Sequence, residues 1–238
     1  MNGNTIVITG GATGIGFAMA KYFHGRGNTV IICGRREDRL AQAAGELRGL
    51  RTFRCDVADP GDRSALFQYV NANFPGTNIL INNAGIQRDI DLTKGLSNLD
   101  GGDSEIRINF EAPVYLSALF TPLLAGRENA VIVNISSGLA FMAERAFGMP
   151  VYCATKAALH AFSLAQRKQL APLGIRVVEI IPPMVESELN MESRRKRNML
   201  KSPNMMTSDE FVAKALAKME QGEDEISIAM AALLEGLD

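Results

Sequence analysis

The feature that most constrains this fold is the regular alternation of two kinds of segment along the chain. Short runs rich in Val, Ile and Thr alternate with longer stretches of helix-forming residues. The short runs are continuously apolar, which is typical of strands covered by helices on both faces. Strands joined by helices predict a doubly wound, parallel, seven-stranded sheet of the α/β class. The expected strands are Thr5–Thr9, Thr29–Cys33, Thr52–Cys55, Ile79–Ile81, Ala130–Ile135, Arg176–Ile180 and Ile226–Ala229.

Helices are expected between these strands, and one of them has a clear start signal. Pro60 directly follows Asp59, which suits an N-cap followed by a proline at the first helical position. No repeat or linker divides the 238 residues, so we expect a single domain spanning residues 1–238. The expected helices are Gly16–Arg26, Asp38–Leu47, Pro60–Asn73, Asp103–Leu124, Val151–Leu173 and Ser208–Glu220.

Composition excludes several classes of function. The formal net charge of −1 provides no general field that would gather nucleic acid or an anionic membrane. The apolar runs are strand-sized and the first begins at Thr5, so we expect neither a transmembrane helix nor a signal peptide, and the cytoplasm is the default location. Three cysteines without a CxxC pair, and only two histidines, predict neither a disulfide framework nor a metal site.

A glycine-rich turn, Thr9–Gly16, follows the first expected strand and opens the first expected helix. In such a turn the first glycine permits the sharp bend, the second lets the backbone approach a pyrophosphate, and the third allows close packing of helix on strand. The helix N-terminus then offers free N–H groups to the phosphates. This context favours a nicotinamide dinucleotide site in a Rossmann fold over a plain glycine turn. The expected cofactor-binding residues here are Gly10, Thr13, Gly14, Ile15 and Gly16.

The end of the second expected strand indicates which dinucleotide is bound. An NAD site usually carries a carboxylate there that binds the ribose 2′-hydroxyl. This chain has Gly34 followed by Arg35 and Arg36, and guanidinium groups pair well with phosphate. We therefore predict NADP(H), with Arg35 as the main contact to the 2′-phosphate and Arg36 as the second. The alternative is that both arginines are solvated surface charges.

A tyrosine and a lysine four residues apart begin the fifth expected helix. Tyr152 and Lys156 would lie on one helix face, one turn apart. Ser136 and Ser137 follow the fifth expected strand, and the carboxyl ends of parallel strands face the ligand crevice. We expect Ser137 to lie near the nicotinamide, with Ser136 as a weaker alternative.

Several motifs together resemble the short-chain dehydrogenase/reductase family. The stretches most similar to its DltE-like branch are Ile32-Cys33-Gly34-Arg35, Gly85-Ile86-Gln87-Arg88 and Ile181-Pro182-Pro183. The resemblance covers nearly the whole chain and its motifs follow the order of that family. They are the turn at Thr9–Gly16, Asp56-Val57, Asn82-Asn83-Ala84-Gly85, Asn109, Ser137, the Tyr152/Lys156 pair, and Pro182-Pro183-Met184-Val185-Glu186-Ser187.

The resemblance implies a role for each of four residues. Tyr152 would be the general acid in carbonyl reduction and the base in the reverse direction. A free phenol has a pKa of about 10, and an ammonium about 4 Å away would lower it by about three units at most. Lys156 would supply that charge and bind the nicotinamide ribose, Ser137 would hold the carbonyl oxygen, and Asn109 would carry a water in a proton relay.

The resemblance also implies further contacts to the cofactor. Asp56 and Val57 would meet the adenine, and Val185 with Ser187 would bind the carboxamide. Thr13 replaces a basic residue that many NADPH-using members carry, so the arginines alone would support that preference. The remaining residues expected to line the cofactor are Asn83, Ala84, Gly85, Tyr152, Lys156 and Pro182.

The segment of about residues 185–207 is polar, basic and rich in methionine, and the family implies that it folds over the substrate as a lid. Apolar residues here and between Ser137 and Tyr152 would form two walls around a substrate with an apolar part, although filling of the core would explain them equally well. The basic run Arg194–Arg197 fits a solvated helix better than a site for an acidic group. The expected wall residues are Met184, Met191, Met199, Met205, Met206, Leu139, Phe141, Met142, Phe147 and Met149.

These residues are compatible with three functions. The leading one is an NADPH-dependent reductase of ketones or aldehydes. The second is a non-catalytic NADP(H)-sensing regulator, and the third is a sugar-nucleotide dehydratase or epimerase, for which the region after the sixth strand leaves little room. The family also implies a homodimer or homotetramer that pairs through the helices containing Pro113–Leu124 and Ala157–Leu164.

Overall fold

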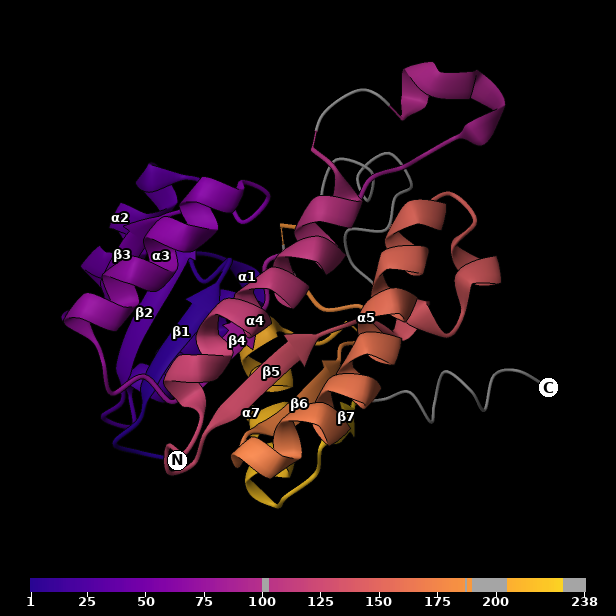
Figure 1. Cartoon of the computed structure of the whole chain (residues 1–238). Helices are drawn as coiled ribbons and strands as arrows, with labels where there is room; N and C mark the ends of the chain where they lie inside the picture. The colour runs from indigo at the N-terminus through magenta and orange to yellow at the C-terminus, as the bar shows by residue number, and fades with distance from the viewer. Residues whose placement is uncertain (100–102, 187, 190–204, 229–238) are drawn as a thin grey trace.

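The computed structural model describes residues 1–99, 103–186, 188–189 and 205–228. Within them the strands form one parallel sheet with the order β3-β2-β1-β4-β5-β6-β7, which confirms the expected seven-stranded sheet (Figure 1). The order reverses direction between β1 and β4, where a doubly wound sheet opens its ligand crevice. The strands are β1 (Thr5–Thr9), β2 (Thr29–Gly34), β3 (Arg51–Arg54), β4 (Ile79–Asn82), β5 (Val131–Ile135), β6 (Arg176–Ile181) and β7 (Glu225–Ser227).

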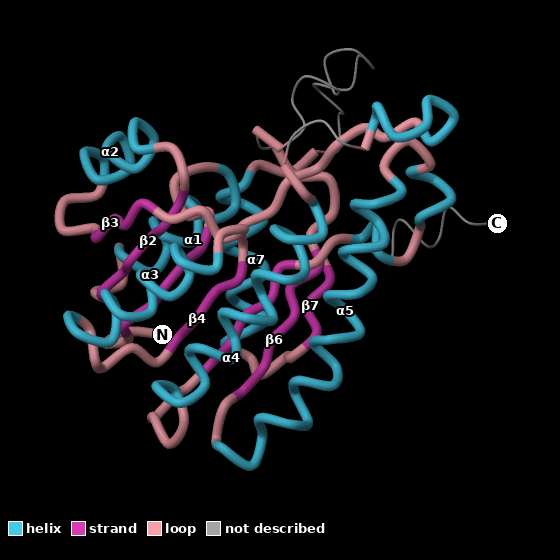
Figure 2. The backbone as a smooth tube through the Cα atoms, turned by 45° about the horizontal axis from the view of Figure 1, so that its top comes forward, coloured by secondary structure: helices cyan, strands magenta, loops and turns pink. Residues whose placement is uncertain are grey.

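Helices cover both faces of the sheet, as the continuously apolar strands require. Successive side chains of β1 point to opposite faces: Ile6 and Ile8 pack with α1, α2 and α7, whereas Val7 packs with α3 and α4. Figures 1 and 2 show the sheet between these two layers. The helices are α1 (Gly14–His24), α2 (Glu37–Glu46), α3 (Pro60–Asn73), α4 (Ala112–Leu124), α5 (Pro150–Leu170) and α7 (Ser208–Glu220).

Most expected boundaries are confirmed to within two residues, and the largest difference lies in the helix expected over Asp103–Leu124. Helical structure there begins at Glu105, and a π-helical segment, η2 (Arg107–Glu111), precedes α4. A second difference is the 3₁₀ segment η1 (Leu92–Asn98), which lacks the apolar periodicity that would have indicated it. Both differences fall between β4 and α4 in the order of the chain.

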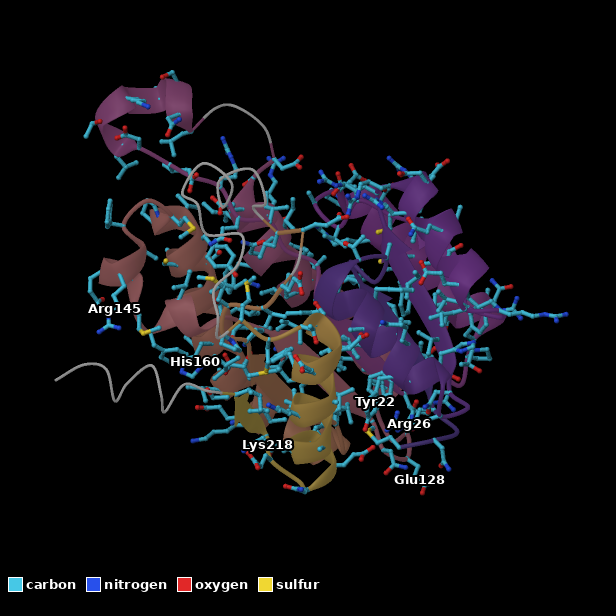
Figure 3. All side chains as sticks on the ribbon, turned by 180° about the vertical axis from the view of Figure 1, so that it is seen from behind. Tyr22, Arg26, Glu128, Arg145, His160 and Lys218 are labelled. Atoms are coloured by element: carbon cyan, nitrogen blue, oxygen red, sulfur yellow. The ribbon has the colours of Figure 1, made fainter. Side chains whose placement is uncertain are left out.

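The ends of two helices follow the expected chemistry. Asp59 accepts a hydrogen bond from the backbone N–H of Asp62 and caps α3, with Pro60 in the first turn. Thr207 and Glu210 form a reciprocal capping box at the start of α7. Just after the end of α1, the Arg26 guanidinium lies 3.5 Å from the centroid of the Tyr22 ring, and Figure 3 shows the two side by side.

None of the helices in the described residues combines the length and the apolar character needed to cross a membrane. Cys33, Cys55 and Cys153 are all buried and carry free thiols.

Candidate active site

The glycine turn joins β1 to α1 with a backbone that only glycine adopts readily. Gly10 and Gly14 have φ values of +63° and +55°. Thr13 is the N-cap of α1, but its side chain makes no capping hydrogen bond, and the first turn of the helix carries no acidic residue. The first amide groups of α1 are therefore left to bind an anion, as at other phosphate-binding helix ends.

Side chains from two neighbouring strands hold this turn in place. The Thr9 hydroxyl accepts hydrogen bonds from the backbone N–H groups of Asn83 and Ala84, each at 3.0 Å. The Asn83 amide in turn donates to the carbonyl oxygens of Thr9 and Gly10 at 2.9 and 3.1 Å. These four bonds tie the carboxyl end of β1 to that of β4, so Asn83 and Ala84 lie beside the glycine turn.

Arg36 reaches the start of α1 from the end of β2. Its guanidinium donates to the Thr13 hydroxyl at 3.2 Å and pairs with Glu188 at 2.9 Å. Arg39 pairs with the same carboxylate at 3.0 Å. The contact with Thr13 places the Arg36 guanidinium beside the turn that precedes the first amides of α1.

Arg35 points to a different set of partners beyond the end of β2. Its guanidinium lies 2.5 Å from the Asp103 carboxylate and 3.9 Å from that of Asp56. Val57, the next residue, is buried in the core on the other side of the sheet from α1. Asp56 and Arg35 therefore lie together at this edge, where the adenosine half of a dinucleotide would be expected.

Tyr152 and Lys156 lie one turn apart on α5 and both are buried. The Lys156 ammonium donates a hydrogen bond of 2.8 Å to the carbonyl oxygen of Ile135 at the end of β5. It lies 5.8 Å from the centroid of the Tyr152 ring. The structure thus brings the expected pair together at the carboxyl edge of the sheet.

Burial changes the chemistry of this lysine. It lowers the pKa of Lys156 from 10.5 to about 8, while the charge of Glu179 on β6 acts in the opposite direction. The shift corresponds to a cost of about 3 kcal/mol for holding the charged form in the fold at neutral pH. Lys156 therefore remains mostly protonated at pH 7 and loses its charge as the pH rises through about 8.

A pH series on Lys156→Met tests this cost. Between about pH 8 and 10.5 the unfolded wild-type chain carries a proton on Lys156 that the folded chain lacks, so wild-type stability should rise with pH relative to the variant. We expect the difference in unfolding free energy to change by about 3 kcal/mol over this window in urea titrations. Lys168→Met, on the exposed face of the same helix, is the control and should show no such slope. A flat difference for Lys156→Met would contradict the burial cost.

Asn109 lies in the π-helical segment and is fully buried. Its side chain accepts from the Ile86 N–H and donates to the Ile86 carbonyl oxygen, both at 2.8 Å, and also donates to the Thr155 hydroxyl at 3.2 Å. A Cβ at Gly85 would lie 3.4 Å from the side-chain oxygen Oδ1 of Asn109 and 3.6 Å from Lys156 Nζ. Gly85, Asn109 and Lys156 therefore lie next to one another. The π-helical segment that carries Asn109 is of a kind that occurs frequently at functional sites.

Ser137 follows β5 and caps the short segment η3 (Gly138–Ala140). Its hydroxyl oxygen accepts from the Leu139 N–H at 3.2 Å, which leaves the hydroxyl hydrogen available for another acceptor. The Ser136 hydroxyl is also buried and makes no hydrogen bond within the described residues. The Pro182 carbonyl oxygen accepts from the Gly138 N–H at 3.0 Å, so the segment after β6 runs beside that of Ser137.

Sequence comparison agrees with this arrangement. Residues 4–198 match the model of the short chain dehydrogenase family. The chain belongs to the short chain dehydrogenase family. It is 47% identical to the uncharacterized oxidoreductase DltE of Bacillus subtilis over 95% of this chain and 88% of that protein, which confirms the predicted family and branch.

Two solved structures of short chain dehydrogenases and related enzymes resemble the fold closely. The short-chain dehydrogenase from Sphingobium yanoikuyae, in complex with NADPH, is 28% identical and has a TM-score of 0.82, with 98% of this chain and 93% of that chain covered. The bulky-bulky ketone specific alcohol dehydrogenase from Comamonas testosteroni is 27% identical and has a TM-score of 0.80, with 99% and 90% covered.

In this short chain dehydrogenase the expected substrate walls are only partly exposed. Phe147, Met184 and Phe141 are exposed, whereas Met142 is buried and Met206 packs against the core, so filling of the core explains these last two. Val185 is buried and bridges to Met206. Leu139, Met149 and Met205 are half-buried. Ser187, Met191, Met199, Arg194–Arg197 and most of the expected lid lie outside the described residues.

Sequence reasoning missed several residues that shape the site. Thr155 supports Asn109, and Thr9 supports the backbone of Asn83 and Ala84. Asp103 and Glu188 form ion pairs with Arg35 and Arg36 after the end of β2. Nothing in the sequence pointed to the last two, because they pair with arginines 68 and 152 residues away.

Proposed function

We propose that this protein transfers hydride between NADP(H) and a carbonyl or alcohol substrate. The proposal rests mainly on the buried Tyr152–Lys156 pair at the carboxyl end of β5, which β4 separates from β1 and its glycine turn. The turn fits a dinucleotide, because its amides are uncapped and its glycines have positive φ. NADP(H), when bound, supplies or accepts the hydride.

The residues of the chain would handle the proton and the substrate oxygen. In reduction, Tyr152 would donate its phenolic proton to the carbonyl oxygen, while the free hydroxyl hydrogen of Ser137 would stabilise the same oxygen. Lys156 would hold positive charge beside the phenol. A water carried by Asn109, which meets Lys156 across Gly85, would relay the replacement proton. A non-catalytic sensor would need none of these groups, so their presence together supports turnover.

The preference for NADP(H) is supported by the end of β2. No carboxylate lies there on the strand itself, and Arg35 and Arg36 follow Gly34 instead. Both guanidiniums are paired with carboxylates, so a 2′-phosphate would have to compete with Asp103 and Glu188 for them. Phosphate carries more charge than a single carboxylate and can bind a guanidinium bidentately, which favours the exchange.

Replacing Arg35 by Asp tests this preference. The added carboxylate would repel the 2′-phosphate and could accept from a ribose 2′-hydroxyl, so we expect the ratio of kcat/KM for NADPH over NADH to fall about 10- to 100-fold. Arg48→Asp, an exposed residue just after α2, makes the same change of charge and should leave the ratio unchanged. An unchanged ratio in Arg35→Asp would remove Arg35 from the 2′-phosphate site.

A substrate with an apolar part is the class that the exposed residues support best. Phe147 is 87% exposed and Met184 is 44% exposed, and both belong to the segments expected to form the substrate walls, so they are available to an apolar group. The Comamonas testosteroni relative acts, by its description, on bulky-bulky ketones, which agrees with this class. We extend the proposal to ketones or aldehydes that carry an apolar or aromatic group.

Pairing of chains through α4 and α5 stays a prediction. Most apolar residues of α4, among them Leu116, Phe120 and Leu124, are buried within the chain itself. Tyr115 on α4 and Leu164 on α5 remain 55% and 41% exposed and are available to a homodimer or homotetramer.

A further inference from the structure

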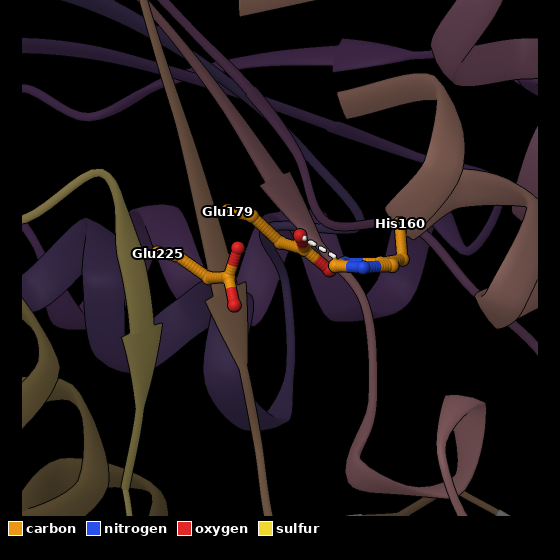
Figure 4. A group of neighbouring side chains, drawn as sticks. All are labelled: His160, Glu179 and Glu225. Atoms are coloured by element: carbon orange, nitrogen blue, oxygen red, sulfur yellow. Dashed lines mark hydrogen bonds and ion pairs between the residues drawn. The ribbon is translucent and has the colours of Figure 1, made fainter. Parts of the chain in front are cut away.

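A group of one imidazole and two carboxylates lies behind the candidate active site, where none of the roles above requires it. His160 is on α5, one turn beyond Lys156, while Glu179 and Glu225 are on the neighbouring strands β6 and β7. Glu179 and Glu225 are register partners, so their side chains leave the same face of the sheet side by side. Figure 4 shows the Glu179 carboxylate between Glu225 on one side and the His160 ring on the other.

The central carboxylate is incompletely satisfied. Glu179 is fully buried, and one of its oxygens accepts from His160 Nδ1 at 2.8 Å. Its other oxygen, Oε1, is buried and has no hydrogen-bond partner within the described residues. The Lys156 ammonium donates to Ile135 instead, so it does not fill this position. A buried carboxylate with a bare oxygen is costly, and a second carboxylate at the register position adds repulsion.

The spacing of the three groups suits a metal ion. One ligand atom from each of the three lies within 4.8 Å of the others. Two ligands of a tetrahedral Zn²⁺ ion, each about 2.1 Å from it, are about 3.4 Å apart. Nδ1 and the Glu179 oxygen, which lie 2.8 Å apart, would move apart by about 0.6 Å to admit the ion. Glu225 is exposed and its side chain can swing inward to complete the set.

We propose that His160, Glu179 and Glu225 bind a divalent transition-metal ion of the Zn²⁺ class. The ion would take the place of the proton between Nδ1 and the Glu179 oxygen, and a neutral imidazole would keep its proton on Nε2. An imidazole nitrogen with two carboxylates favours Zn²⁺ over Mg²⁺, which prefers oxygen ligands and retains its water. The ion would join α5, β6 and β7 behind Lys156. The proposal does not rest on the proposed hydride transfer, although the charge of Glu179 also acts on Lys156.

A simple ion pair between His160 and Glu179 is the competing explanation. It accounts for the hydrogen bond of 2.8 Å. It does not explain why Glu179 Oε1 lacks a hydrogen-bond partner within the described residues, or why Glu225 lies beside a buried carboxylate. The two explanations differ in one measurable respect, because only the metal site requires Glu225.

Titration of the full-length, untagged and metal-stripped protein with ZnCl₂ in a calorimeter tests the proposal. We expect one Zn²⁺ per chain at this site, with binding weakened at least tenfold in Glu225→Gln and in His160→Gln. Glu128→Gln removes the same charge from an exposed residue remote from His160 (Figure 3) and should bind Zn²⁺ as the wild type does. With Co²⁺ as the probe, the visible absorption of the bound ion should change in His160→Gln.

A thermal scan identifies any variant that fails to fold. Each variant should melt cooperatively without metal, and added Zn²⁺ should raise the Tm of the wild type and of Glu128→Gln but not that of Glu225→Gln. Absence of saturable Zn²⁺ binding, or equal binding by wild type and a folded Glu225→Gln, would overturn the proposal.

Discussion

Replacing Tyr152 by Phe is expected to lower kcat for NADPH-dependent carbonyl reduction by about 10²- to 10⁴-fold, the usual contribution of a positioned general acid. The substitution removes the phenolic oxygen and keeps the ring, which is buried on α5 beside Lys156. The fold and the glycine turn should be unaffected. We therefore expect the affinity for NADPH, measured by fluorescence titration, to change much less than kcat.

Tyr115→Phe provides the matched control for this substitution. Tyr115 is 55% exposed on α4, so loss of its hydroxyl should leave both kcat and the Tm close to the wild-type values. Retention of full reductase activity by Tyr152→Phe would exclude the phenol as the proton donor. Loss of NADPH binding together with activity would instead show that the tyrosine acts through the cofactor site.

The second large effect is expected from Gly16→Ala in the first turn of α1. A Cβ at this position would lie 2.4 Å from the Gly10 carbonyl oxygen and 2.5 Å from the Asn83 side-chain nitrogen. Neither can move without disturbing the turn, because Asn83 also bonds the backbone of Thr9 and Gly10. We expect a destabilisation of about 1–3 kcal/mol, as for overpacked cores, and a loss of NADPH affinity.

Gly45→Ala separates the effect of this contact from the general effect of the substitution. Gly45 lies on the exposed face of α2, and a Cβ there meets nothing within 4 Å. Alanine should therefore stabilise the helix by about 0.5–1 kcal/mol and leave NADPH binding unchanged. Wild-type affinity and stability in Gly16→Ala would contradict the close approach of α1 to the ends of β1 and β4.

The layered fold could be predicted because its determinants are local in the sequence. Continuous apolar runs such as Val30–Cys33 indicate strands with two covered faces, and Asp59 with Pro60 indicates the start of α3. The glycine turn and the Tyr152–Lys156 spacing are local for the same reason. These features needed no knowledge of which distant segments meet.

The remaining features depend on contacts between distant segments. The π-helical geometry at Asn109 accompanies two hydrogen bonds to Ile86, 23 residues earlier. The sequence pattern of Arg107–Glu111 does not predict this geometry. The pairing of Arg36 with Glu188 joins residues 152 apart. The group of His160, Glu179 and Glu225 forms only because β6 and β7 are neighbours in register, which the spacing of single residues does not encode.

Transfer of label from NADPH carrying deuterium at the reactive carbon of its nicotinamide tests the central claim most directly. The purified protein would be incubated with a panel of aromatic and aliphatic ketones and aldehydes, and the alcohols analysed by mass spectrometry. The account predicts deuterium on the carbinol carbon of at least one product with the wild type, and labelling about 10²- to 10⁴-fold slower with Tyr152→Phe. Tight NADPH binding without transfer to any member of a broad panel, or transfer of equal extent by Tyr152→Phe, would contradict it.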